Sequence, residues 1–137
     1  MDEQKEKVNL VGIHVDESRY AQRTLLDLRD NLAGTRAAYA LFVSWLVSKP
    51  NGVARDNEVQ TAFGRLDVTY TSAGDKIPDP PPGWNSDLPT LADQGTPFGQ
   101  LYVAVVHEVD PTYTGSAVDA MNHVASMLGL PLFTGAP

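Results

Sequence analysis

The stretch AQRTLLDLRDNLAGTRAAYALFVSWL, residues 21–46, decides the fold that the sequence predicts. Its apolar and small residues recur at alternating intervals of four and three positions, a spacing that places them in one stripe along an α-helix. The stripe consists of Ala21, Leu25, Leu28, Leu32, Thr35, Tyr39, Phe42 and Leu46. Because its phase does not change across Gly34, we expect one uninterrupted helix, about 45 to 48 Å long at 1.5 Å per residue.

Both ends of this helix carry boundary signals. Asp16 and Ser18 are suitable N-cap residues, and Glu17 suits the positive end of the helix dipole. At the other end Lys49 precedes a proline, which cannot continue a helix. Gly52 follows, and we expect it to adopt the left-handed conformation of the turn.

The two halves of the helix differ in polarity. Residues 19–36 are charged away from the stripe, whereas residues 37–47 are apolar nearly all round, because Val43 and Trp45 lie off the stripe. A helix that is apolar on every side is buried on every side. We therefore expect the second half in the centre of a core or in a contact between chains. The expected interface residues are Tyr39, Phe42, Val43, Trp45, Leu46 and Trp84.

A second helix is expected from about residue 56 to residue 73. The four-and-three spacing continues there through Val59, Phe63, Leu66, Tyr70 and Ala73. The intervening KPNGVAR, residues 49–55, is short enough to fold the two helices into an antiparallel hairpin. RLDVTYT, residues 65–71, leaves an alternative open, since its alternation and β-forming residues favour a strand after Gly64.

The last third of the chain contains one ambiguous segment and one clear helix. PFGQLYVAVVHEVDP, residues 97–111, fits a helix by spacing, but its four valines between Leu101 and Val109 favour a buried strand. In the final segment Ser116 is a suitable cap, and a helical stripe ends at Gly129. That stripe is made by Val118, Met121, Ala125 and Leu128. VNLVGIHV, residues 8–15, is a further candidate strand.

These patterns predict one mostly α-helical domain over residues 1–137. It is built on the long helical hairpin and shorter C-terminal helices, and a Pro-rich connector at about residues 74–97 crosses it. The alternative is an α+β domain with short strands at 8–15, 66–71 and 100–109.

The connector is too long for an ordinary loop, and it has four prolines in five residues, which favours the polyproline II conformation. Trp84 and Leu88 follow the prolines, whereas a flexible linker is usually rich in glycine and serine. We expect an ordered strap over the helices, held by these two side chains. A projecting arm that docks onto a partner and a disordered segment are the alternatives.

Charge and composition restrict the classes of function. Residues 1–50 carry seven acids and seven bases, whereas residues 51–137 carry ten acids and only Arg55, Arg65 and Lys76, which gives the net charge of −7. Nucleic-acid binding relies on Lys and Arg, so we expect none. The longest nearly apolar run has 11 residues, short of a membrane span, and the charged N-terminus is no signal peptide. We expect a cytoplasmic protein.

Candidate chemistry centres on two histidines and two acids. Asp119 and His123 lie one turn apart on the last helix, and His107 with Glu108 completes an oxygen and nitrogen ligand set of the kind that zinc, iron or manganese accepts. The chain has no cysteine, no phosphate-binding glycine loop and no Gly-x-Ser-x-Gly elbow. No cofactor is therefore predicted.

The function most consistent with these features is non-catalytic: a helical assembly or adaptor module that binds a second copy of itself or another protein. The first alternative is a small metal- or ligand-binding enzyme that uses His107, Glu108, Asp119 and His123. The second is an acidic protein that occupies a basic site on its target.

Overall fold

The computed structural model describes residues 2–13 and 23–134, and within these ranges the chain forms helices and no strand. The helices are α1 (Asp2–Gly12), α2 (Thr24–Val47), α3 (Gly52–Ser72), α4 (Leu91–Gln94), α5 (Pro97–Val109) and α6 (Ala117–Leu128). The prediction of a mostly α-helical protein is confirmed. The α+β alternative is wrong, because residues 8–12, 66–71 and 100–109 are all helical; residues 14 and 15 of the first candidate strand lie outside the described ranges.

Residues 97–109, which the sequence left ambiguous between helix and strand, are helical. Their start carries two helix signals that a strand does not use. The hydroxyl of Thr96 accepts a hydrogen bond from the backbone N–H of Gly99 (3.1 Å), and Pro97 occupies the first helical turn of α5. The residues that α5 buries then follow helical spacing, including Phe98, Leu101 and Val105. The final helix begins at the Ser116 cap and ends at Gly129 in the left-handed conformation (φ 70°), as expected.

Helix α2 runs without interruption through Gly34, as its stripe predicts. Its 24 described helical residues correspond to about 36 Å, so the expected length of 45 to 48 Å is too long for this part of the chain. The candidate caps Asp16 and Ser18 lie outside the described residues. The turn to α3 also differs from expectation, because Asn51 takes the left-handed conformation (φ 63°) and Gly52 already begins α3.

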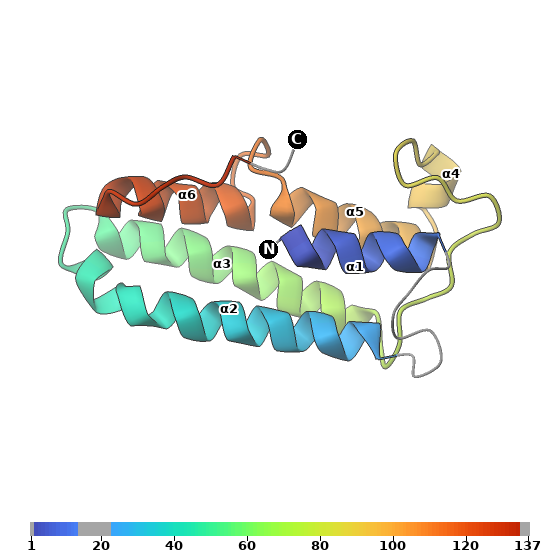
Figure 1. The fold of residues 1–137 in the computed structure, drawn as a ribbon, viewed down its shortest axis with the longest axis horizontal. Coiled ribbons are helices and arrows are strands. Elements are labelled where there is room, and N and C mark those ends of the chain that lie inside the picture. Colours follow the sequence, from blue (N-terminus) through green and yellow to red (C-terminus); the bar gives the residue numbers. More distant parts are fainter. Residues whose placement is uncertain (1, 14–22, 135–137) are drawn as a thin grey trace.

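Gly52 is required for a different reason than its backbone angle. A Cβ atom at this position would lie 1.9 Å from the carbonyl oxygen of Leu46, so only glycine lets α3 start this close to the end of α2. The tight connection places α2 and α3 side by side (Figure 1).

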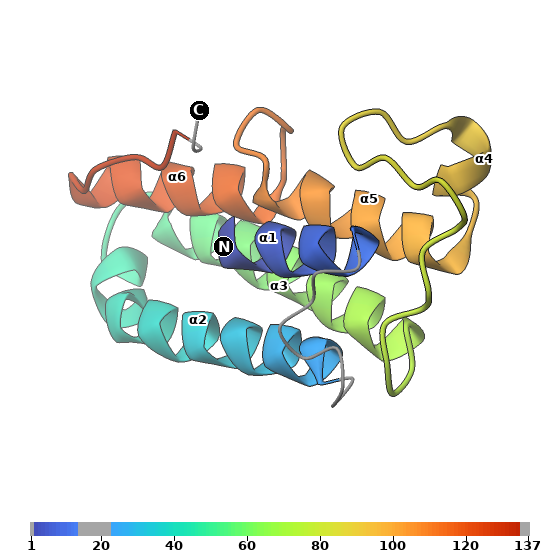
Figure 2. The same ribbon diagram turned by 45° about the vertical axis from the view of Figure 1, so that its right-hand side comes forward.

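Helix α3 is the central element of the bundle. It contacts α2 on one side and α5 and α6 on the other, and α5 and α6 follow one another along it (Figures 1 and 2). Helix α1 packs on α5 and α2, at the end of the bundle where α2 begins. A continuous core joins these helices and contains Val8, Leu25, Leu28, Leu32, Val59, Phe63, Leu66, Phe98, Val105 and Val124.

A buried hydrogen bond ties α1 to the central helix. The hydroxyl of Tyr70 on α3 donates to the side-chain oxygen of Gln4, and both residues are about 1% exposed. Burial is the main cause that raises the pKa of Tyr70 above that of a free tyrosine. The phenol therefore remains a donor across the physiological pH range.

The connector between α3 and α4 is anchored by Trp84, which is 9% exposed. Its ring lies edge-on to Phe98 (4.9 Å between centroids) and to Tyr102 (5.0 Å). Gly12 makes this possible, because a Cβ there would lie 2.7 Å from the indole nitrogen. Leu88, by contrast, is 78% exposed, so it does not act as the second expected anchor.

Candidate protein-interaction surface

The second half of α2 is largely exposed. Leu41 is 81% exposed, Trp45 45%, Phe42 40% and Val47 40%. The expectation that this half lies in the centre of the core is therefore wrong within a single copy of the chain. The reason is its position at the end of the bundle, where α1 does not reach (Figures 1 and 2). The other expectation, a contact between chains, stays a prediction.

The structure separates the expected interface residues into two groups. Tyr39 (7%), Leu46 (0%) and Trp84 (9%) belong to the protein's own core, and Val43 packs partly against that core. Phe42 and Trp45 are exposed. Tyr39, Leu46 and Trp84 therefore pack inside a single copy of the chain. Phe42 and Trp45 remain accessible to a partner.

Sequence reasoning missed Leu41, although it is the most exposed large apolar residue of α2. At 3.6 residues per turn Leu41 lies about 200° around the helix from Tyr39, so it points away from the core that Tyr39 enters. A signal existed in the chain: an apolar residue opposite a well-formed apolar stripe has no place in the core that the stripe faces.

An apolar cleft adjoins this exposed face. It lies between α2 and α6, and its volume is about 310 Å³. Its walls are formed by Thr35, Ala38, Tyr39 and Phe42 of α2, by Met121, Val124, Ala125 and Leu128 of α6, and by Leu130. At the other end of the bundle α1 lies between α2 and α5 (Figure 2), whereas no residue of α1 lines the cleft.

Tyr39 lines the cleft and is largely buried. Its hydroxyl donates to a carboxylate oxygen of Asp56 on α3 (3.0 Å), and its ring lies edge-on to Phe63 (5.8 Å between centroids). Burial, followed by the hydrogen bond to Asp56, raises the pKa of Tyr39 well above the usual value. The phenol of Tyr39 therefore stays neutral and donates to Asp56 across the physiological pH range.

The surface around the cleft carries no charge over long stretches. Residues 37–48 of the α2 end and residues 124–134 after the middle of α6 contain no Asp, Glu, Lys or Arg. Lys49 follows at the end of α2, and its ammonium nitrogen lies 5.6 Å from the centroid of the Trp45 ring. In a chain with a net charge of −7, this uncharged surface is a local exception.

The four candidate metal ligands do not form one group. Glu108 is bound by Arg65 (Nη2 to Oε2, 2.9 Å) and by the backbone N–H of Ala117 (2.9 Å). His107 packs on the Tyr113 ring, with the centroids 4.6 Å apart. Among residues 2–13 and 23–134, no three His, Asp or Glu side chains lie together as a metal ion requires.

His123 belongs to a separate surface network. Its Nδ1 lies 3.4 Å from a Glu58 oxygen and 3.2 Å from an Arg55 nitrogen, and its Nε2 lies 3.8 Å from Asp119. The hydrogen bond with Arg55 is the largest cause that lowers the pKa of Glu58. The network joins α3 to α6 through the imidazole of His123.

Glu108 instead has a structural role that sequence reasoning did not identify. It is 4% exposed, and its two oxygens join Arg65 of α3 to the first turn of α6. Arg65 also donates to the Gly115 carbonyl oxygen (2.6 Å). A carboxylate that accepts a backbone N–H at a helix N-terminus is favourably placed. The ion pair therefore fixes the junction of three helices.

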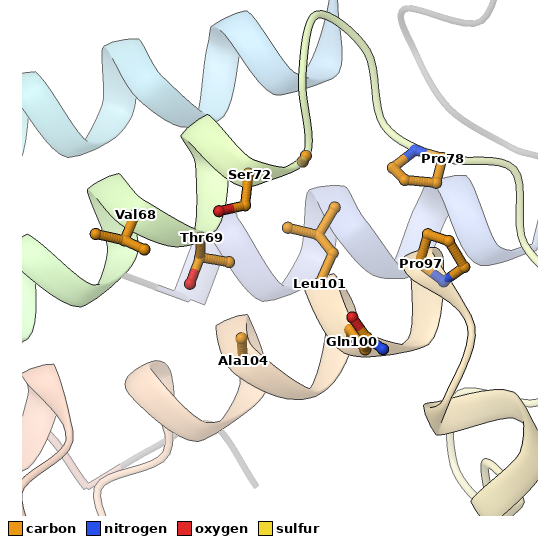
Figure 3. A pocket seen from close by; sticks show the side chains of 9 residues that line it. Val68, Thr69, Ser72, Pro78, Pro97, Gln100, Leu101 and Ala104 are labelled. Carbon is orange, nitrogen blue, oxygen red and sulfur yellow. The ribbon is translucent and has the colours of Figure 1, made fainter.

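A second groove lies between α3 and α5. Its volume is about 360 Å³, and Figure 3 shows side chains of both helices along it, with Pro78 and Pro97 near one end. A neighbouring hollow of about 460 Å³ shares Thr69, Gln100 and Ala104 with it and reaches Arg65 and His107. The walls mix polar and apolar groups, so they indicate no particular ligand.

Comparison with known proteins adds no family to these observations: no protein-family model, no curated protein and no solved structure matches the chain. Within the described residues, every helix is too short or too polar to cross a lipid bilayer.

Proposed function

We propose that this protein is a non-catalytic interaction module that self-associates through the exposed end of α2 and the α2–α6 cleft. The observation that carries the proposal is the exposure of Leu41, Phe42 and Trp45 beside an apolar cleft. Contiguous apolar surface of this kind marks interaction sites in soluble proteins. Trp is also among the residues that contribute most to binding at protein interfaces.

The area of this surface is consistent with a dimer interface. Leu41, Phe42, Trp45 and Leu130 together expose on the order of 400 Å² of apolar surface. A standard interface buries about 800 Å² per partner, of which somewhat more than half is apolar. The four side chains therefore supply most of the apolar area that such an interface needs.

Charge favours a second copy over an unrelated partner. Two acidic copies repel one another, unless they meet through surfaces that carry no acids. Residues 37–48 and 124–134 are such surfaces. A basic partner, which the overall charge would attract, finds no carboxylate there to pair with, so the surface does not favour the alternative of an acidic protein that occupies a basic site.

The test compares two leucines that are almost equally exposed. Leu41 is 81% exposed at the proposed interface, and Leu91 is 87% exposed on α4, remote from the cleft. Native mass spectrometry and sedimentation at tens of micromolar should show a dimer for the unaltered protein and for Leu91→Glu. Leu41→Glu should be monomeric and as helical by circular dichroism, because a buried, unpaired carboxylate opposes association.

An unaltered protein that is monomeric at these concentrations would contradict the proposal. A dimer that Leu41→Glu leaves intact would show that the copies associate through another surface.

A further inference from the structure

We infer that two copies pair through antiparallel α2 helices, around a two-fold axis at the level of Tyr39. The inference rests on the proposed self-association and places the contact between the two copies on the outward face of α2, with the α2–α6 cleft at its edge. Its starting point is the face of α2 that points away from the core. Exposed residues recur there at intervals of four and three positions: Asp30, Gly34, Ala37, Leu41, Ser44 and Ser48.

This face is compatible with a partner helix along its whole length. Intervals of four and three keep the same face in contact with a second helix over several turns. The pattern is also symmetric about residue 39, because residue 30 corresponds to 48, 34 to 44, and 37 to 41. An antiparallel two-fold pairing therefore places Leu41 of each copy beside Ala37 of the other, where the small side chain leaves room for it.

The charges at the two ends of the face specify the antiparallel orientation. Asp30 is exposed near one end, and Lys49 follows the other end. In the antiparallel pair Asp30 of each copy lies near Lys49 of the other. A parallel pair would instead place the two Asp30 side chains together and the two Lys49 side chains together. Exposed ion pairs of this kind determine orientation more than affinity.

Gly34 gives an independent reason for a close neighbour on this face. Glycine inside a helix is less stable than alanine. A usual reason for its presence is a neighbouring group that packs too closely on the helix for any side chain. Within the described residues, a Cβ at Gly34 would meet no atom within 4 Å, so the single copy does not require glycine. In the antiparallel pair Trp45 of the second copy lies at the level of residue 33, directly beside Gly34 and the edge of the cleft. The indole fits there because Gly34 has no side chain.

Two matched glycines test this point. Gly64 on α3 is also helical, and a Cβ there also meets no described atom within 4 Å. Gly34→Leu should weaken dimerisation at least tenfold, whereas Gly64→Leu should change it less than threefold. Equal dimerisation constants for the two variants, measured by sedimentation, would overturn the placement of Trp45.

Site-directed cross-linking tests the orientation, since the natural chain has no cysteine. Asp30→Cys and a size-tagged Ser48→Cys are prepared separately, mixed, and treated with a short bismaleimide. The antiparallel pair predicts a product of mixed size and no product from Ser48→Cys alone, which keeps Asp30 and Lys49 in both copies, because residues 48 of the two copies lie about 27 Å apart along the helices. Leu91→Cys serves as the control for random collision, and circular dichroism checks that each variant is folded.

The remaining outcomes distinguish a wrong antiparallel geometry from a failure of self-association itself. Cross-linking of Ser48→Cys with itself would indicate a parallel pair and overturn the inference. A dimer in native mass spectrometry that gives neither product would also overturn the inference, while self-association stands. A monomer in native mass spectrometry overturns both.

Discussion

The ion pair between Arg65 and Glu108 provides the sharpest test of the fold, because its two partners differ in exposure. The Glu108 side chain is 5% exposed, whereas the Arg65 side chain is 43% exposed. Arg65→Met keeps the aliphatic stem but leaves the buried carboxylate with the hydrogen bond from Ala117 and with the His107 imidazole 3.7 Å away. We expect a loss of about 3–5 kcal/mol in the free energy of unfolding, the usual cost of leaving a buried charge unpaired.

The complementary change should cost less. Glu108→Gln removes the negative charge but retains the shape and an oxygen that can accept from Ala117 or Arg65. The remaining guanidinium reaches water and still donates to the Gly115 carbonyl. We therefore expect a loss of about 1.5–3 kcal/mol, the value for hydrogen bonds to charged groups.

Urea unfolding at one fixed protein concentration measures both values. Asp67→Asn is the control, because Asp67 pairs with Arg36 on the surface and its side chain is 54% exposed; its loss should stay below about 1 kcal/mol. Equal losses in the free energy of unfolding for Glu108→Gln and Arg65→Met would contradict this reasoning. They would mean that the cost of burying an unpaired carboxylate does not explain the effect of removing Arg65.

Three further predictions concern packing and association. Gly12→Ala should lower the free energy of unfolding by about 1–3 kcal/mol in a urea titration, because the new methyl group displaces Trp84; Gly64→Ala, which has space around it, should not lower it. Tyr70→Phe should cost about 1–3 kcal/mol in the same assay, because it leaves the buried Gln4 oxygen without this donor, and an unchanged stability would contradict that role. Dimerisation measured by sedimentation should weaken little as salt is added, since the proposed surface is uncharged apart from the exposed Asp30–Lys49 pairs at its two ends; a steep loss would indicate an electrostatic interface instead.

Elements with a long pattern or a complete cap were predictable from the sequence. The stripe of α2 persists across Gly34 because one residue without a side chain does not alter the phase of its neighbours. For α6, Ser116 and Gly129 fix the two ends through local hydrogen bonds and backbone conformation. Helix α5 remained ambiguous because its spacing fits a helix whereas its valines favour a strand, and the signals at its start, Thr96 and Pro97, separate the two.

The features that sequence reasoning missed depend on residues far apart in the chain. Arg65 and Glu108 are 43 positions apart, and Gln4 and Tyr70 are 66 positions apart. No local periodicity reports such pairs. The candidate metal ligands do not come together among the described residues, and Glu108 is engaged by an arginine that its neighbours in sequence do not reveal. Leu41 was overlooked because only Val43 and Trp45 were singled out as apolar residues off the stripe, although Leu41 lies off it as well.

The position of α1 over only one end of the bundle has a consequence for the dynamics of α2. The beginning of this helix is enclosed by α1 and α3, whereas its last turns contact α3 and border an open cleft. Amide hydrogens at the two ends should therefore exchange with solvent at very different rates, although they belong to one continuous helix. Association of two copies would slow exchange in the last turns selectively, so the protection profile of this single helix would report the assembly state of the protein.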